Sequence, residues 1–196
     1  MARRGSYAKG VAKREEILGV ALEVIAQDGY RAASVKEIAD AVGLSQAGLL
    51  HYFSSKEELF VEILRKRDEL DQDSLDGSPA ELREGFLRVI RHNVSTPGLV
   101  ELFSRQAAEA ADAEHPAHAF FLLRNAALRE SLTSALRRVG NDSDGAIAGV
   151  DPDTIARMIQ AVADGVQLQW LLDPEVDMTG VVDALLGLLI EKSGHE

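Results

Sequence analysis

The stretch from Ser34 to Lys56, SVKEIADAVGLSQAGLLHYFSSK, constrains the fold more than any other part of the sequence. Ser34 and Glu37 have the spacing of a capping box, in which a hydroxyl and a carboxylate satisfy the free amides at a helix start. Apolar residues then follow with the i, i+3, i+4, i+7 spacing of a helix that has one buried face. The pattern predicts a short helix that begins after Ser34. Its apolar residues are Val35, Ile38, Ala39 and Val42.

A tight turn and a second helix come next. Gly43 supplies the left-handed residue that ends a helix, Leu44 fills the turn, and Ser45 caps a helix that we expect to run to about Phe53. This helix has small residues near its start and only a narrow apolar stripe, through Leu49 and Phe53. A helix that lies in the DNA major groove needs such a slim leading edge, with hydrogen-bonding groups near its N-terminal end. The stretch therefore predicts a helix-turn-helix.

The sequence resembles the TetR family of bacterial transcriptional regulators over about residues 11–64. The resemblance rests on the first helix REEILGVALEVIAQDGY, on GLSQAGLLHYF and on SSKEEL, and HYFSSKEEL is its most specific run. It implies that Tyr52 and Lys56 lie where members of the family contact phosphates. Ser55 and Glu58 also have the spacing of a second capping box, at the start of the next helix.

The residues of the second helix divide by chemistry into base readers and phosphate contacts. Gln46 is the expected base reader, because its amide pairs with adenine N6 and N7. Ala47 and Gly48 keep the leading edge thin, and Leu50 is placed to meet a thymine methyl group. Relatives often have tyrosine where this chain has Leu50 and a hydroxyl residue where it has Gly48, so the operator sequence is left open. We expect phosphate contacts, which set register rather than sequence, from Ser34, His51, Tyr52 and Lys56.

Charge is distributed so that only one end of the chain suits DNA. The 196 residues carry a net charge of −11, yet residues 1–67 hold 11 basic and 9 acidic side chains, against 10 and 23 in residues 68–196. Residues 1–14 contain five cations and no acid. Beside a helix-turn-helix, such a basic arm favours contact with phosphates, and a solubilising tail is the alternative. The five cations are Arg3, Arg4, Lys9, Lys13 and Arg14.

The rest of the chain shows helical periodicity throughout, interrupted by Gly, Pro and Asp. It predicts an all-α fold of about nine helices, with an N-terminal three-helix head on a larger helical body. Besides the two helices of the helix-turn-helix and one that starts after Ser55, we expect helices over about 13–27, 80–95, 99–111, 116–139, 151–172 and 179–191.

The breaks between these helices predict four segments. We expect a basic arm over residues 1–10, a DNA-binding domain over 11–56, a connecting helix over 57–76, and a ligand-binding and dimerisation domain over 77–196.

The last two predicted helices are apolar on more than one face, which indicates burial on two sides. A pair of helices central to the core of one subunit is the alternative explanation. The resemblance implies instead that these helices pair with their copies in a four-helix dimer interface. The expected interface residues are Ile159, Val162, Val166, Val182, Leu185, Leu186 and Leu189.

The resemblance also implies a pocket among the middle helices for an unidentified, largely apolar small-molecule effector. Aromatic residues on helices are also ordinary core, so each lining residue has a structural alternative. Arg105, Arg124 and Asp164 are charges within apolar stretches, which either a ligand contact or an ion pair explains. The candidate lining residues are Phe86, Ile90, Phe103, Phe120, Phe121, Arg124, Asp164 and Gln167.

No catalytic motif is recognisable in the sequence. It has no cysteine, no glycine-rich phosphate loop, and no nucleophile with a base at motif spacing. His115 and His118 are close enough to share a metal ion, but Pro116 between them favours an ordinary helix start, so we expect neither a metal nor a cofactor. No apolar run reaches the length of a membrane span, and the N-terminus lacks the core of a secretion signal. We therefore expect a cytoplasmic protein without a membrane partner.

These features predict a regulator rather than an enzyme. We expect it to bind a near-palindromic operator in double-stranded DNA as a homodimer, and to act as a repressor that the effector releases. A constitutive DNA-binding regulator without an effector is the alternative.

Overall fold

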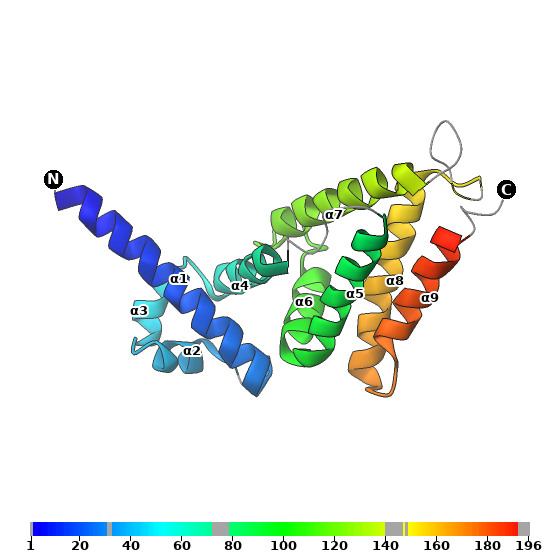
Figure 1. Ribbon diagram of the computed structural model, residues 1–196. Coiled ribbons are helices and arrows are strands. Elements are labelled where there is room, and N and C mark those ends of the chain that lie inside the picture. The colour runs from blue at the N-terminus through cyan, green and yellow to red at the C-terminus, as the bar shows by residue number, and fades with distance from the viewer. Residues whose placement is uncertain (1, 31–32, 72–78, 140–146, 148, 192–196) are drawn as a thin grey trace. The chain divides into compact units, whose positions relative to one another are not determined.

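A computed structural model of the chain describes residues 2–30, 33–71, 79–139, 147 and 149–191. In these residues it has nine α-helices, and its only β-structure is an isolated antiparallel bridge between Ile147 and Val150. The predicted all-α fold is confirmed. Figure 1 labels the helices. By their packing they fall into two compact units, which are described separately below.

Unit 1 comprises Met1–Leu70 and Thr96–Phe120. Ile17 and Ile25 of its first helix, Ile38 of the second and Ile63 of the fourth are fully buried. On α1, Ala21 lies between Ile17 and Ile25 at helical spacing and is also buried, and on α4 the buried Leu59 and Phe60 lie one turn before Ile63, so these helices bury a stripe. The helices of unit 1 are α1 (Ala2–Asp28), α2 (Val35–Ala41), α3 (Gln46–Leu50), α4 (Lys56–Asp71) and α6 (Pro97–Glu109).

Helices α1 and α6 meet backbone to backbone within unit 1. Gly98, in the first turn of α6, makes this possible, because a Cβ atom there would lie 2.1 Å from the carbonyl oxygen of Ile25 and 2.8 Å from the Cα of Gly29. Only a residue without a side chain allows so close an approach.

Unit 2 comprises Asp71–Ser95 and Phe121–Glu196. Helix α9 packs against both α5 and α8, and buried aliphatic side chains of the unit form one continuous core. Asp151 caps α8 by accepting a hydrogen bond from the amide of Thr154, and Pro152 takes the first helical position, where its missing amide costs nothing. The helices are α5 (Pro79–Ser95), α7 (His118–Val139), α8 (Pro152–Leu172) and α9 (Met178–Glu191); the first residues of α7 belong to unit 1.

The largest difference from the predicted helices concerns α1, which starts at Ala2 rather than near Lys13. The residues before Lys13 are mostly Ala, Arg and Lys, which have high helix propensity, so two glycines do not end the helix. The predicted division into arm, DNA-binding domain, connecting helix and body stays a prediction. By packing, α6 groups with unit 1.

Candidate nucleic-acid interface

Helix α2 begins with the capping box that the sequence predicts. The hydroxyl oxygen of Ser34 accepts a hydrogen bond from the amide of Glu37 at 3.2 Å, and the Glu37 carboxylate accepts one from the amide of Ser34 at 2.7 Å. These bonds to its charged form, first from the Ser34 amide and then from its hydroxyl, hold the pKa of Glu37 below its ordinary value. Ile38 and Ala39 are buried, so α2 is fixed at its start and along one face.

The turn after α2 has the predicted left-handed glycine. Gly43 has φ of 68°, and the amide of Leu44 donates to the carbonyl of Ala39 at 2.8 Å. The same carbonyl also accepts from the amide of Val42 at 3.2 Å, so both bonds close the end of α2. Ser45 then caps α3, because its hydroxyl accepts a hydrogen bond from the amide of Gly48 at 3.0 Å.

Helix α3 is held by its apolar residues and leaves the candidate DNA contacts accessible. Leu49 is 0% exposed, and Phe53 just beyond the helix is 1% exposed, which confirms their predicted structural role. The predicted contacts on and near α3 are all exposed or half-buried. Ser34, Gln46, Ala47, His51 and Lys56 are exposed, and Gly48, Leu50 and Tyr52 are half-buried.

Helix α3 is shorter than the sequence predicts, since it ends at Leu50 rather than near Phe53. The amide of Tyr52 donates to the carbonyl of Leu49 at 3.0 Å, a bond that tightens the chain into a turn. His51 and Tyr52 therefore lie in this turn, with their ring centroids 6.1 Å apart.

The start of α4 departs from the predicted capping box in one bond. The Ser55 hydroxyl accepts from the Glu58 amide at 3.0 Å, as expected, but the Glu58 carboxylate accepts from the amide and hydroxyl of Ser54 instead of the amide of Ser55. Hydrogen bonds from Ser54, and more weakly the charge of Arg14, keep the pKa of Glu58 below its ordinary value. Lys56 lies at the exposed start of the helix, its ammonium 5.2 Å from the Phe60 ring centroid.

Two of the five cations near the N-terminus, Lys13 and Arg14, lie against the helix-turn-helix. Lys13 pairs with Glu16 at 2.7 Å and donates to the carbonyl of Val42 at 3.3 Å. Arg14 donates to the carbonyl of Tyr52 and pairs with acids of α4. This role of Lys13 and Arg14 is not evident from the sequence, where only their spacing from Ile17 on the buried face of α1 hints at it. Lys9 is exposed.

The eight candidate ligand residues are divided between the two units. Phe103 and Phe120 belong to unit 1 and the other six to unit 2. Phe86 and Ile90 are part of the apolar core of unit 2. The other four candidates of unit 2 lie on α7 and α8: Phe121, Arg124, Asp164 and Gln167.

Two polar candidates have identified partners. Gln167 is buried and accepts a hydrogen bond from the side-chain amide of Asn93 at 3.4 Å. Arg105 makes an ion pair with Glu101 at 2.8 Å. Of the two explanations considered for this residue, the structure therefore shows the ion pair. The Arg105 guanidinium also lies 5.4 Å from the Tyr30 ring centroid.

Four of the seven predicted dimer residues are buried in the core of their own unit, and the predicted interface stays a prediction. The four are Ile159, Val166, Val182 and Leu186. The sequence shows that α8 and α9 are apolar on two faces, but it does not show which face is inside. Val162, Leu185 and Leu189 are half-buried.

The two histidines considered for a metal site bond to different groups. His118 Nδ1 lies 2.8 Å from the carbonyl oxygen of Ala110, and His115 Nε2 lies 3.5 Å from a carboxylate oxygen of Glu109. In the part of the chain that the structure describes, no three potential metal ligands gather, and no helix is both long and apolar enough to span a membrane.

Comparison with known proteins agrees with this geometry. Residues 17–63 match the family model of bacterial regulatory proteins of the tetR family, and residues 108–191 match the C-terminal model of BetI-type transcriptional repressors. The HTH-type transcriptional repressor KstR2 of Rhodococcus jostii is 33% identical over 109 residues, which cover 56% of this chain and 48% of the repressor. The match thus spans about half the length of this relative.

Solved structures share the fold over nearly the whole chain. A TetR-family transcriptional regulator from Rhodococcus sp. has a TM-score of 0.68 at 21% identity, over 90% of this chain and 97% of its own. AibR, in complex with isovaleryl coenzyme A and operator DNA, has a TM-score of 0.57 at 24% identity, over 90% and 97%. Because matches to the family lie in both the helix-turn-helix and the C-terminal helices, the chain belongs to the TetR family of bacterial regulatory proteins.

Proposed function

We propose that the chain is a sequence-specific DNA-binding transcriptional regulator, and not an enzyme. The observation that carries the proposal is the surface of α3. Leu49 anchors the helix in the core, while Gln46, Ala47 and His51 remain exposed beside it. A short helix with a thin, accessible N-terminal edge fits the major groove, where base pairs are distinguishable by their hydrogen-bonding groups.

The exposed residues have separate roles in this proposal. Gln46 reads a base through its amide, Ala47 and Gly48 allow the backbone to approach, and the half-buried Leu50 contacts a thymine methyl group. Phosphate contacts fix the register of the helix in the groove. They come from Ser34, His51 and Lys56, which are exposed, and from Tyr52, which is half-buried.

Dimerisation uses a surface of α8 and α9 that we define as the outer stripe. On α8, Met158, Ala161, Gly165, Leu168 and Leu172 recur at alternating spacings of three and four, and Leu168 is 52% and Leu172 88% exposed. On α9, Val181, Ala184 and Leu188 continue the pattern, and Leu188 is 62% exposed. Apolar residues spaced in this way form the seam between paired helices.

A second copy of this chain is the proposed occupant of the outer stripe. A two-fold dimer brings the same patch of each subunit together, so one apolar stripe is sufficient for both sides. Two copies of α3 then lie about 34–36 Å apart, or a multiple of this, and read a near-palindrome. Family membership supports this occupant, because two half-sites require two heads.

We further propose that the regulator is a repressor released by a small, largely apolar effector. The match of residues 108–191 to BetI-type repressors supports repression, and the complex of AibR with isovaleryl coenzyme A supports control by a ligand. The effector weakens operator binding only by its differential affinity for the two conformations of the dimer. A constitutive regulator without an effector is the alternative outcome of the experiment below.

Selection of duplexes from a random DNA library tests the first part of the proposal. The full chain is expected to enrich an inverted repeat, and no enrichment would refute sequence-specific binding. Thermal shift against a metabolite library then tests the second part, with Trp170 of α8 as a fluorescence reporter. A true effector lowers the affinity for the selected duplex, and the duplex lowers effector affinity by the same factor. If no compound does so, the constitutive reading stands.

A further inference from the structure

Helix α1 places two consecutive cations against the ends of the two helices that form the helix-turn-helix. The Lys13 ammonium donates to the carbonyl of Val42, the C-cap of α2, at 3.3 Å, and Arg14 donates to the carbonyl of Tyr52, just beyond α3. The C-terminal end of a helix carries partial negative charge on its free carbonyls, so cations are stabilising there.

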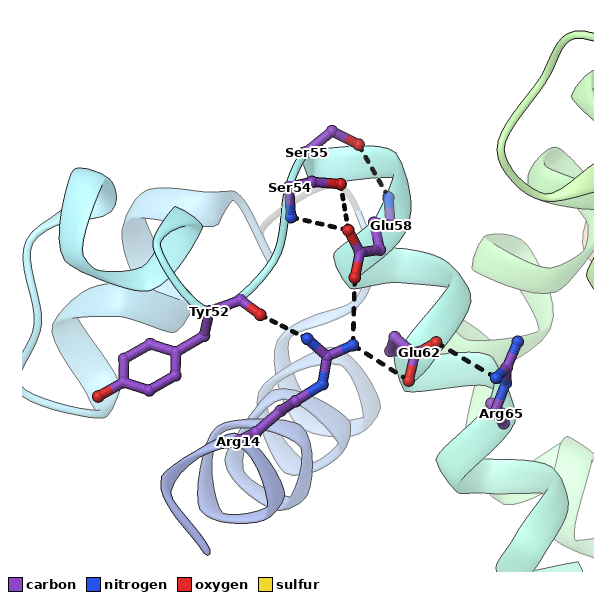
Figure 2. Close-up of polar contacts among 7 residues, drawn as sticks. All are labelled: Arg14, Tyr52, Ser54, Ser55, Glu58, Glu62 and Arg65. Carbon is purple, nitrogen blue, oxygen red and sulfur yellow. Dashed lines mark hydrogen bonds and ion pairs between the residues drawn. The ribbon is translucent and has the colours of Figure 1, made fainter. Parts of the chain in front are cut away.

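Arg14 connects more elements than Lys13 does. Besides the Tyr52 carbonyl, its Nη2 lies 3.2 Å from a carboxylate oxygen of Glu58 and 3.3 Å from one of Glu62, both on α4. Its guanidinium also stacks over the Phe53 ring, with the carbon atom 4.3 Å from the ring centroid. Figure 2 shows the guanidinium between the Tyr52 carbonyl on one side and the two carboxylates on the other.

The surroundings of Arg14 make it a poor contact for a DNA phosphate. Its guanidinium already contacts three oxygen acceptors, the Tyr52 carbonyl and the carboxylates of Glu58 and Glu62. Glu62 also pairs with Arg65 at 3.6 Å. The four side chains Arg14, Glu58, Glu62 and Arg65 carry two charges of each sign, so the cluster does not attract an anion. A phosphate that approached Arg14 would meet two carboxylates and be repelled.

The backbone carbonyl and the side chain of Tyr52 point in different directions. In Figure 2 its carbonyl points toward Arg14 and its phenol ring points away. The same residue therefore offers its carbonyl to Arg14 and its ring to the side where we propose phosphate contact.

We infer that Arg14 is a positioning residue for operator recognition, which fixes the C-terminal end of α3 to the first turns of α4. This inference rests on the proposed function. Because the guanidinium is a rigid planar fork, it holds the Tyr52 carbonyl and the two carboxylates at fixed angles to one another. The bases that Gln46 meets then depend on a residue that touches no DNA.

The variant Arg14→Lys separates positioning from charge. Lysine keeps the positive charge, but a single ammonium cannot span the same acceptors as the planar fork. We expect its affinity for the duplex selected by the wild-type chain to fall about tenfold or more, as for the loss of a charged hydrogen bond. Affinity for a scrambled duplex of equal composition should change less than about twofold, and the slope of log affinity against log salt should stay the same, because no phosphate contact is lost.

Lys9→Gln is the matched control on the same helix, since Lys9 is an exposed cation of α1. Removal of this charge should weaken binding to the selected and the scrambled duplex by a similar factor and leave the ratio of the two affinities unchanged. The decisive readout is the ratio of the affinity for the selected duplex to the affinity for the scrambled duplex. A variant that is only destabilised loses both affinities in proportion to its folded fraction, so their ratio stays the same. Circular dichroism at the assay temperature gives that fraction.

Glu62→Gln provides a second variant if Arg14→Lys does not fold. It keeps Arg14 and the Tyr52 bond and removes one charged acceptor, so the affinity ratio should fall about twofold to fivefold. An unchanged ratio in the folded Arg14→Lys protein, or in Glu62→Gln where that replaces it, would overturn the inference and leave the proposed function intact. If the wild-type chain itself selects no duplex, the proposed function fails and the inference with it.

Discussion

Neighbouring residues of α3 differ in role because a five-residue helix has room for little more than one buried side chain. Leu49 occupies that place and is fully buried, so the helix presents Gln46 and Ala47 outward. The hydroxyl of Ser45 fixes the start of the helix by accepting from Gly48. Base reading and folding thus use separate residues, and mutations can test them separately.

We predict that Gln46→Ala changes sequence preference and that Lys56→Ala does not. Loss of the Gln46 amide should cost about 1–3 kcal/mol at one base position and relax the preference there. Loss of the Lys56 ammonium should weaken all sequences about equally and reduce the salt slope by about one. Binding titrations on the selected duplex and on each of its single-base variants measure both effects. If Gln46→Ala weakened binding to every duplex equally, Gln46 would not be the base reader.

The capping box of α2 predicts a specific dependence of stability on pH. The pKa of Glu37 is lowered from 4.5 by its bonds from Ser34, so its ionised form stabilises the fold. This contribution is complete above pH 4.5 and is lost as the pH falls through the lower pKa of the folded state. Urea unfolding should therefore find Glu37→Gln less stable than wild type at pH 7, with a smaller difference at pH 3. Glu23→Gln, a control at an exposed carboxylate of α1, should show no such change, and an equal change would contradict the prediction.

At the scale of helices, α1 is the element that joins the others of unit 1. Its Lys13 and Arg14 hold the ends of α2 and α3, and its last turn packs against Gly98 of α6. Helix α1 therefore contacts both the end of α3, the proposed reading helix, and α6, which follows α5 in the sequence. The packing at Gly98 is the part of this arrangement that tolerates the least change.

We predict that Gly98→Ala is strongly destabilising. The added methyl would lie 2.1 Å from the Ile25 carbonyl oxygen and 3.0 Å from the Tyr30 amide nitrogen, and neither backbone atom can be relieved by a change of rotamer. Such overpacking should lower the free energy of unfolding by about 1–3 kcal/mol or more. Gly19→Ala on α1 is the matched control, because its methyl would meet nothing within 4 Å. It should stabilise the helix by about 0.5–1 kcal/mol. Urea denaturation of both variants measures the difference, and equal stability would contradict the close contact.

The helix ends show how far the sequence could predict the elements. Local signals were sufficient where one residue determines the boundary, as at Ser34, Gly43 and Asp151. They failed at the start of α1 and at the end of α3, which lack such a residue. The Arg14 cluster could not be predicted, because the partners of Arg14, from Tyr52 to Glu62, are 38 to 48 positions away along the chain. An arginine near the N-terminus looks the same in sequence whether it bonds to a phosphate or to a carbonyl.

For the molecule as a whole, the sequence does not show which apolar face of α8 and α9 is buried within the single chain and which is left exposed. Both faces of α8 and α9 are apolar, and hydrophobic periodicity gives the period of a stripe but not its direction. Ile159 and Val166 face the core of unit 2, whereas Leu168 of the same helix is exposed. Assigning the faces requires the position of α5, which packs against α9 from a distant part of the sequence.

A charge placed in the outer stripe should dissociate the proposed dimer. Leu168→Glu and Leu188→Glu each place a charge on an exposed surface of the single chain, so the fold of the monomer should be little changed. In a dimer that buries this stripe the same charge would be unpaired and desolvated, which should raise the dissociation constant of the dimer at least about a hundredfold. Leu122→Glu on α7 is the matched control, because Leu122 is 60% exposed but outside the stripe.

Sedimentation at micromolar concentration should find the control as a dimer and both stripe variants as folded monomers. Because a monomer carries one head, the stripe variants should also lose most of their affinity for an inverted repeat, while their weak binding to a single half-site is retained. A wild-type chain that sediments as a monomer would refute the proposed occupant. Stripe variants that remain dimeric would place the interface elsewhere on the molecule, and dissociation by Leu122→Glu would place it on α7.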